Sequence, residues 1–137
     1  MSTHDKCATP DYVVRAMMDI IQPAQHPHAR WLEPSAGDGA IVRGLLRAGA
    51  INVTAVEADF CLADKLHEDG LGVQVWNSDF LQWSLFAPHH RYRAVANPPF
   101  TGKQTMQHIA AMRAVCSCFW LLAPAGLLEP CQNRGDV

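Results

Sequence analysis

Four consecutive residues, Asn97-Pro98-Pro99-Phe100, carry groups that could hold a planar amine. They follow the apolar stretch 92–96, and two adjacent prolines cannot continue a sheet ladder because neither has an N–H to donate. The chain must leave its strand here and expose an amide side chain, free carbonyl groups and an aromatic ring. Such a segment by itself is more often an ordinary strand-ending turn, so its meaning depends on the rest of the chain.

Three further polar or small-residue segments each follow a predicted strand. They are Glu33-Pro34-Ser35-Ala36-Gly37-Asp38-Gly39, Glu57-Ala58-Asp59 and Asn77-Ser78-Asp79-Phe80. In a parallel sheet, ligands bind at the carboxyl ends of the strands, near the point where the strand order reverses. Any one of the four segments is a weak signal, whereas their order and spacing together are specific.

The segment 33–39 would let a ligand approach the backbone, because Gly37 and Gly39 have no side chain in the way. The acidic Glu33 and Asp38 would suit a cationic ligand and would repel a pyrophosphate. The dinucleotide pattern GxGxxG is absent, since Val42 occupies the third glycine position. The alternative interpretation is a plain turn between a strand and a helix.

The next two segments could bind a nucleoside. Glu57 could accept hydrogen bonds from two ribose hydroxyls, although a solvated acidic residue at a strand end is the alternative. Asp79 could accept from an exocyclic amine, and Phe80 could stack on a base. Taken singly, these two would more often be a helix N-cap and a core aromatic residue.

These segments need a scaffold of alternating strands and helices to position them. We predict strands at 30–33, 52–57, 73–76, 92–96 and 118–122. We predict helices at 10–21, with Thr9 as N-cap, and at 41–46, 62–67 and 104–115. This alternation predicts an α/β fold, with a mostly parallel sheet and helices on both of its faces.

Length and composition indicate a single soluble domain over residues 1–137. Of its 137 residues, 49% are hydrophobic and 18% are charged. We expect an N-terminal helix and loop (1–28), a core (29–125) and an irregular tail (126–137). No apolar run approaches the ~20 residues of a membrane helix, and the N-terminus lacks a signal-peptide core. We therefore expect a cytoplasmic protein without membrane contact.

Charge and cysteine content restrict the possible partners. The net charge of −2 is not the basic profile of a dedicated nucleic-acid binder. Contact with nucleic acid would need a partner or a local basic patch. One modest cluster could meet phosphates or could simply be solvated, namely His89, His90, Arg91, Arg93 and Lys103. The five cysteines have neither CxxC nor zinc-ligand spacing, so we expect free thiols and no metal site.

The segments EPSAGDG, VEAD, NSDF and NPPF, in this order, resemble the motifs of class I S-adenosylmethionine-dependent methyltransferases. NPPF resembles the (D/N)PP(Y/F) signature of amino-methyltransferases, especially the N6-adenine DNA enzymes, although RNA and protein-glutamine methyltransferases use close variants. Cys7-Ala8-Thr9-Pro10 resembles the N-terminal motif of enzymes with the gamma-type order. The resemblance covers about residues 7–125. It implies a Rossmann-like, doubly wound sheet with strand order 3-2-1-4-5, and a bacterial or phage origin.

The resemblance implies S-adenosylmethionine as the cofactor. Ser35, Gly37 and Gly39 would line its methionine part, Glu33 would face its amino end, and Glu57 would hold the ribose. Other residues would close over the cofactor or flank its adenine. The full implied set is Thr9, Pro10, Glu33, Pro34, Ser35, Ala36, Gly37, Gly39, Glu57, Ala58, Asp59, Asp79 and Phe80.

The resemblance also implies a catalytic segment made of Asn97, Pro98, Pro99 and Phe100. The Asn97 side-chain oxygen and the Pro98 carbonyl could both accept from the N6 amine of adenine in DNA, with Phe100 stacked on the base. Accepting these hydrogen bonds frees the nitrogen lone pair for attack on the methyl group, so positioning and hydrogen bonding lower the barrier. A base in a duplex would have to be flipped out to reach the site.

The chain departs from this family after Leu122, where the family's sheet normally continues with a helix and two more strands. DNA enzymes of this order usually also carry a target-recognition region. We therefore expect a truncated or decayed enzyme, or one completed by a partner chain or by self-association at the fifth-strand edge. The alternatives to a DNA adenine methyltransferase are a catalytically impaired remnant that binds the cofactor or only a protein partner, and an RNA or protein-glutamine N-methyltransferase.

Overall fold

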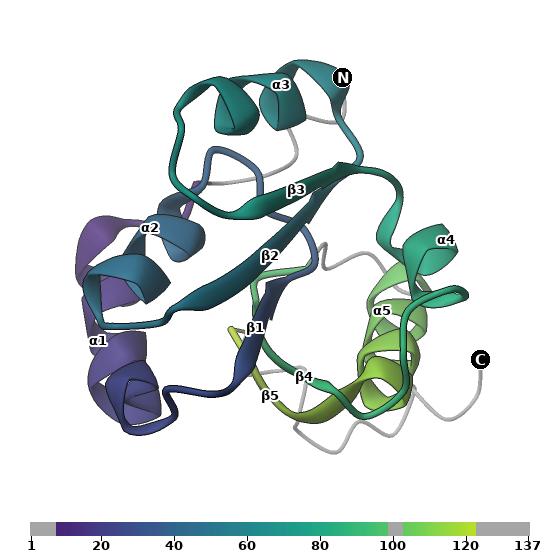
Figure 1. The fold of residues 1–137 in the computed structure, drawn as a ribbon. Coiled ribbons are helices and arrows are strands. Elements are labelled where there is room, and N and C mark those ends of the chain that lie inside the picture. The colour runs from purple at the N-terminus through teal and green to yellow at the C-terminus, as the bar shows by residue number, and fades with distance from the viewer. Residues whose placement is uncertain (1–7, 99–102, 123–137) are drawn as a thin grey trace, which may run out of the picture.

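A computed structural model describes residues 8–98 and 103–122, which form a sheet covered by helices on both faces (Figure 1). The strands are β1 (Arg30–Glu33), β2 (Asn52–Glu57), β3 (Gln74–Asn77), β4 (Tyr92–Ala96) and β5 (Cys116–Leu121). All neighbouring strands are parallel, and their order is β3-β2-β1-β4-β5. The predicted α/β fold and its strand order are confirmed.

The helices are α1 (Asp11–Ile21), the short 3-10 helix η2 (Pro23–Gln25), α2 (Ala40–Arg47), α3 (Phe60–Glu68), α4 (Phe80–Ser84) and α5 (Lys103–Val115). Figure 1 shows α1 and α2 on one side of the sheet and α4 and α5 on the other. Each predicted helix and strand agrees with the observed one to within two residues. α4 was not predicted, because five residues are too few to show a helical period.

Two apolar cores lie on the two faces of the sheet because side chains alternate along each strand. On β4, Val95 packs with α1 and α2, whereas Ala94 and Ala96 pack with Met112 of α5. Residues 94–96 are all fully buried. Burial on both faces is why the central strands read as continuous apolar stretches in the sequence.

The start of α1 differs from the prediction. Pro10, not Thr9, is the N-cap residue, and it makes no side-chain cap hydrogen bond. The Thr9 hydroxyl instead accepts from a side chain 88 residues away, as described below. A tertiary contact therefore takes the place of the local cap that the sequence favours.

Other expectations concern the cysteines, metal binding, membrane contact and the outer edge of the sheet. Cys61, Cys116 and Cys118 are free thiols, and no group of three His, Cys, Asp or Glu residues in the described ranges could hold a metal. Every helix of the described part is too short or too polar to span a bilayer. β5 is an outer strand of the described sheet. That its edge binds a partner chain stays a prediction.

Candidate functional site

The four sequence segments converge on one edge of the sheet. Each follows a strand of the same direction, so all four lie at the carboxyl ends of β1, β2, β3 and β4. The strand order reverses between β1 and β4, which are neighbours in the sheet although two strands separate them in the sequence. This is the position at which open α/β sheets bind ligands. We call it the carboxyl edge.

A buried carboxylate ties the first segment to the second. Glu57 ends β2 and is fully buried. Its Oε1 atom accepts from the Gly37 N–H and its Oε2 atom from the Asp59 N–H, both at 2.7 Å. Hydrogen bonds to an ionised acceptor are among the strongest in proteins. Glu57 therefore fixes residues 34–39, which we call the glycine loop, relative to the start of α3.

In the structure the Glu57 carboxylate contacts loop backbone, and the ribose contact that the resemblance implied stays a prediction. No part of the residue is exposed in this arrangement. Glu33 is also buried, and its Oε1 atom accepts from the Ser35 N–H at 2.7 Å. The sequence correctly marks both residues as polar groups at strand ends. Both carboxylates accept from loop backbone N–H groups, and Glu57 reaches the loop after β1 as well as its own. Their position in the sequence does not reveal this direction.

The glycine loop is compact, and its two glycines have different surroundings. Gly37 has φ +57°, and a Cβ atom there would meet nothing nearer than the Ser35 carbonyl oxygen at 4.0 Å. Gly39 has φ +91°, and a Cβ atom there would lie 2.6 Å from Leu66 of α3. The loop therefore leaves open space at Gly37, while Gly39 allows α2 to start against α3. Pro34 and Ala36 are buried beneath the loop.

The end of β3 is tied to the end of β2 in the same way. The Asn77 Nδ2 atom donates to the Glu57 and Ala58 carbonyl oxygens, each at 3.0 Å. Ala58 is exposed, and Asp59 caps α3 by accepting from the Leu62 N–H at 3.1 Å. Asp79 is exposed and its carboxylate makes no cap hydrogen bond, so it is available to a ligand.

Phe80 does not lie where the sequence-based prediction needs it. Its side chain is only 2% exposed, and its ring stacks on Trp83 and on His108 of α5 at centroid distances of 6.0 and 5.7 Å. Stacking on an adenine requires an accessible ring face. Phe80 is instead a core aromatic residue, which was the alternative interpretation of its position.

The end of β4 meets the segment before α1. The Asn97 Nδ2 atom donates to the Thr9 Oγ1 atom at 3.1 Å, and both residues are half-buried. No described residue donates to the Asn97 Oδ1 atom. Within the described residues, the amide is therefore held with its oxygen open to a further donor. Pro98 is buried and Pro10 is exposed, while the predicted contributions of Pro99 and Phe100 lie outside the described residues.

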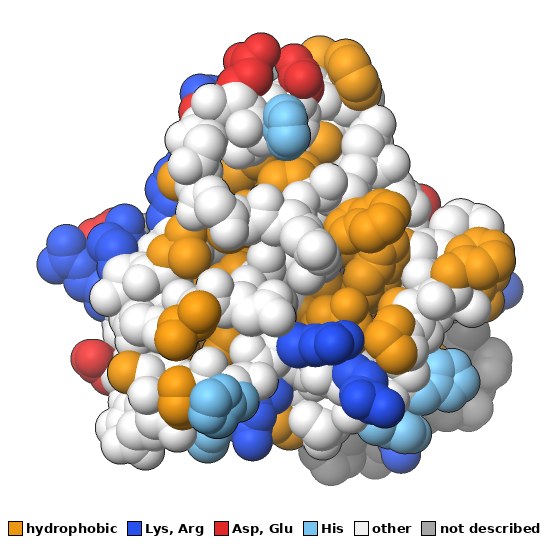
Figure 2. Space-filling model, viewed as in Figure 1, with side chains coloured by type: hydrophobic (Ala, Val, Ile, Leu, Met, Phe, Trp, Pro, Cys, Tyr) orange, Lys and Arg blue, Asp and Glu red, His pale blue; other side chains and the backbone are white. Residues whose placement is uncertain are grey.

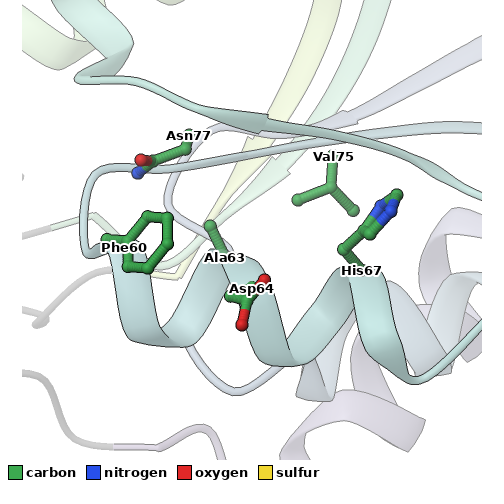
Figure 3. Close-up of a pocket in the computed structure, with 6 residues that line it drawn as sticks. All are labelled: Phe60, Ala63, Asp64, His67, Val75 and Asn77. Carbon is green, nitrogen blue, oxygen red and sulfur yellow. The ribbon is translucent and has the colours of Figure 1, made fainter.

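A small cavity that sequence analysis did not predict lies beside the carboxyl edge, between α3 and β3. It has a volume of about 170 Å³ and is lined by Phe60, Ala63, Asp64, His67, Val75 and Asn77. Figure 3 shows the side chains of α3 below the strand, with Phe60 and Asn77 at one end and His67 at the other. Ligand pockets usually measure about 300–1,000 Å³, so this cavity could hold only part of a ligand.

Phe60 is the one aromatic residue of this cavity, and 68% of it is exposed. Its sequence signal was an aromatic residue directly after Glu57-Ala58-Asp59. An exposed ring beside an exposed Ala58 offers the apolar surface that the buried Phe80 cannot offer. The carboxyl edge as a whole is acidic and suits a cationic ligand, since it carries Glu33, Asp38, Glu57, Asp59 and Asp79.

Neither a family model nor a curated protein matches the chain. Solved structures of methyltransferases do match it. The Escherichia coli protein yhhF, provisionally described as a methyltransferase, aligns with a TM-score of 0.71 and 19% identity over 92% of this chain and 75% of its own. The 23S rRNA methyltransferase ErmE aligns with a TM-score of 0.66 and 22% identity over 82% and 45% of the two chains.

The 16S rRNA N2 G1207 methyltransferase RsmC of T. thermophilus, solved with AdoMet and guanosine, also aligns. Its TM-score is 0.66 and its identity 22%, over 88% of this chain and 36% of that chain. This chain therefore spans less than half the length of ErmE and of RsmC. At these identities the likeness shows the fold, which is that of class I S-adenosylmethionine-dependent methyltransferases.

Proposed function

We propose that this chain transfers a methyl group from S-adenosylmethionine to an exocyclic amine of a nucleic-acid base, with the N6 amine of adenine in DNA as the first candidate. One observation carries the proposal. At the carboxyl end of β4, the Thr9 hydroxyl fixes the Asn97 amide with its oxygen left as the acceptor. A methyltransferase fold and an acidic carboxyl edge surround this amide.

The residues present suit the cofactor. The edge beside Gly37 is open, and the nearby carboxylates complement the positive charges of a sulfonium and an ammonium group. We assign Gly37 and Ser35 to the methionine part, and Asp79 and the exposed Ala58 and Phe60 to the adenine. When bound, S-adenosylmethionine supplies a methyl group that its sulfonium charge has already activated.

In this proposal Glu33 and Glu57 support the cofactor site without contacting the cofactor. Both are buried and accept hydrogen bonds from loop backbone N–H groups, so they shape the loops that contact the cofactor. Preorganised loops bind a ligand with less loss of conformational entropy. These two residues therefore contribute to affinity through the backbone that they hold in place.

Asn97 and Pro98 act on the target amine. The lone pair of an amine on an aromatic base is delocalised into the ring, which makes the nitrogen a poor nucleophile. Asn97 Oδ1 and the Pro98 carbonyl oxygen would each accept one of its N–H bonds and draw the nitrogen toward tetrahedral geometry. The lone pair would then be free to attack the methyl group that S-adenosylmethionine supplies. The S–C electrons would leave on the thioether sulfur of S-adenosylhomocysteine, and one N–H proton would pass to water. Orientation and fixed dipoles lower the barrier.

RNA is the second candidate substrate, and the structural neighbours favour it. ErmE and RsmC are both named as rRNA methyltransferases, and RsmC by its name acts on N2 of a guanine, which is an exocyclic amine. The Asn97 acceptor would serve an amine of either nucleic acid. In duplex DNA the base would have to be flipped out of the helix to reach it.

Calorimetry with S-adenosylmethionine tests the cofactor, and transfer of a labelled methyl group to unmethylated DNA and to RNA tests the substrate. We expect label in adenine of DNA, loss of transfer in Asn97→Ala and normal transfer in the control Asn52→Ala, an exposed asparagine at the amino end of β2. Label in RNA alone would select the second candidate. Cofactor binding without transfer to any substrate would indicate a cofactor-binding remnant, and absence of cofactor binding would overturn the proposal.

A further inference from the structure

The net charge of −2 conceals a strong separation of charge along the chain. Residues 8–79 contain ten acidic and five basic residues, a net charge of −5. Residues 80–122 contain no Asp or Glu and four basic residues, a net charge of +4. The second range forms α4, β4, α5 and β5. The part of the sheet made of β3, β2 and β1 therefore belongs to the acidic range, and the part made of β4 and β5 belongs to the basic range.

Within this basic half, and next to it, four arginines lie around the amino ends of β1 and β4 and the carboxyl end of α5. Arg30 begins β1 and aligns with Tyr92 of β4, while Arg93 aligns with Trp31. The Arg91 N–H donates to the Val115 carbonyl oxygen at 2.9 Å, which places Arg91 at the end of α5 near Arg113. We call Arg30, Arg91, Arg93 and Arg113 the basic rim.

No carboxylate among the described residues forms an ion pair with an arginine of the basic rim. All the ion pairs between two described residues are made by Arg15, Arg43, Arg47 and Lys65, with Asp11 or Asp69. Arg30, Arg91 and Arg113 are exposed, and the neighbouring His89 and His90 are exposed as well. Figure 2 shows Lys, Arg and His side chains in the lower part of the molecule, over the region of β4 and β5, and acidic side chains at the top, over α3.

We propose that the basic rim binds the phosphate backbone of a nucleic acid whose target base lies at Asn97. The inference rests on the proposed function and specifies how the substrate docks. The acidic carboxyl edge suits a cationic cofactor but repels phosphates, so the attraction must come from elsewhere on the surface. Guanidinium groups match phosphate geometry with paired N–H donors.

The length of β4 decides whether one nucleic acid could reach both places. β4 has five residues, and at about 3.3 Å per residue its first residue, Tyr92, lies about 16 Å along the strand from Asn97. Arg91 directly precedes Tyr92. Along one strand of a duplex this corresponds to about five base steps of 3.4 Å. The rim would therefore contact phosphates flanking the target base, and the contacts would add affinity without reading sequence.

The experiment measures binding of labelled DNA and RNA oligonucleotides of the same sequence by fluorescence anisotropy, at salt concentrations between about 50 and 200 mM. The test variant is Arg91→Gln/Arg113→Gln. The matched control Arg15→Gln/Arg47→Gln removes the same charge from exposed arginines in the acidic half. Calorimetry with S-adenosylmethionine on each variant shows that the carboxyl edge is still folded.

For each duplex phosphate that the test variant no longer binds, we expect affinity to weaken roughly eightfold at 0.1 M salt, because the salt slope falls by about 0.9. The control should bind as the parent does. Equal binding and equal salt slopes in the test variant and the parent would overturn the proposal that the basic rim binds nucleic acid. They would leave the proposed methyl transfer unaffected. Rim-dependent binding without methyl transfer would support the rim and contradict the proposed activity. A parent chain that prefers an acidic polypeptide to DNA and RNA would contradict the rim's assignment to nucleic acid.

Discussion

Asn97 is held in one orientation by a residue far away in the sequence. Its Nδ2 atom donates to the Thr9 hydroxyl, and this contact decides which end of the amide a substrate amine would meet. With the amide reversed, its NH2 group would face the N–H bonds of the substrate and could not accept them. In the proposed reaction Thr9 is therefore a positioning residue, whereas the family resemblance implied that it closes over the cofactor.

We expect Thr9→Val to lower the turnover rate of methyl transfer, because valine keeps the shape of threonine but cannot accept from Asn97. The rate should fall roughly two- to tenfold, as for one hydrogen bond of about 0.5–1.5 kcal/mol. Thr9→Ser keeps the hydroxyl and should restore the rate. Steady-state kinetics and cofactor calorimetry test this expectation. Weaker cofactor binding at an unchanged turnover rate would show that Thr9 serves the cofactor instead.

Glu57 is the other residue on which the site depends, since it connects two loops through one buried side chain. In Glu57→Gln one acceptor oxygen becomes an NH2 group that faces a backbone N–H donor. We expect the free energy of unfolding to fall by about 1–3 kcal/mol, the cost of a buried unsatisfied group. Cofactor affinity should fall as well, because the Gly37 loop loses its support.

Urea unfolding and cofactor calorimetry measure the two effects of Glu57→Gln. Glu68→Gln is the control, because Glu68 is an exposed residue at the end of α3. A Glu57→Gln protein as stable as this control would show that the two backbone hydrogen bonds do not hold the loops.

Among the helices and strands, the carboxyl edge depends on how closely α2 begins beside α3. Gly39 is the N-cap residue of α2 at φ +91°, and the side chains of Leu66 and Arg43 lie against it. The Arg43 side chain donates to the Asp38 carbonyl oxygen and also pairs with Asp69 beyond the end of α3. These contacts hold the end of the glycine loop between α2 and α3.

Gly39→Ala should destabilise the protein in two ways. The left-handed backbone costs about 1–2 kcal/mol for a residue with a Cβ atom, and overpacking against Leu66 adds about 1–3 kcal/mol. Gly70→Ala is the matched control, because Gly70 has φ +62° but nothing within 4 Å of an added Cβ atom. Urea unfolding of both variants gives the difference. Equal losses of stability in the two would show that the packing at Gly39 is loose.

In the molecule taken as a whole, the sheet separates two apolar cores and two edges of opposite charge. The carboxyl edge collects carboxylates and the amino ends of β1 and β4 collect arginines. Cys116 lies where β5 begins, in the core shared with α5, and is only 4% exposed. Burial raises the pKa of the Cys116 thiol from 9.0 to about 12, helped by the nearby Cys118 and opposed by a hydrogen bond with the Ala94 backbone.

This raised pKa makes global stability depend on alkaline pH. Above pH 9.0 the thiol ionises in the unfolded chain but stays protonated in the folded one. Its contribution is therefore intact below pH 9.0 and is lost as the pH rises toward about 12. The slope is at most about 1.4 kcal/mol per pH unit. Denaturant unfolding at several pH values should show a steeper decline in the parent than in Cys116→Ala, and parallel declines would contradict the burial of this thiol.

Local rules were enough to predict all the elements of this fold except η2 and α4, and the four strand-end segments, from the amino-acid sequence, whereas the strand order came from the resemblance to methyltransferases. The apolar stretch 92–96 and the prolines after it follow such rules, because burial on both faces and a missing N–H act within a few residues. The four strand-end segments converge for a similar reason, since parallel strands bring their carboxyl ends to one edge.

The contacts of the side chains in the site depended instead on the three-dimensional packing. Phe80 lies in the core because α5 places His108 against it, and Glu57 faces the backbone N–H of Gly37, 20 residues away. The Thr9 hydroxyl serves Asn97 across 88 residues in place of capping its own helix. The arginines of the basic rim lie at one end of the sheet because β1 pairs with β4, and the segment before β4 bonds to the end of α5. Burial and hydrogen-bond partners of this kind arise between distant segments, and no local pattern in the sequence specifies them.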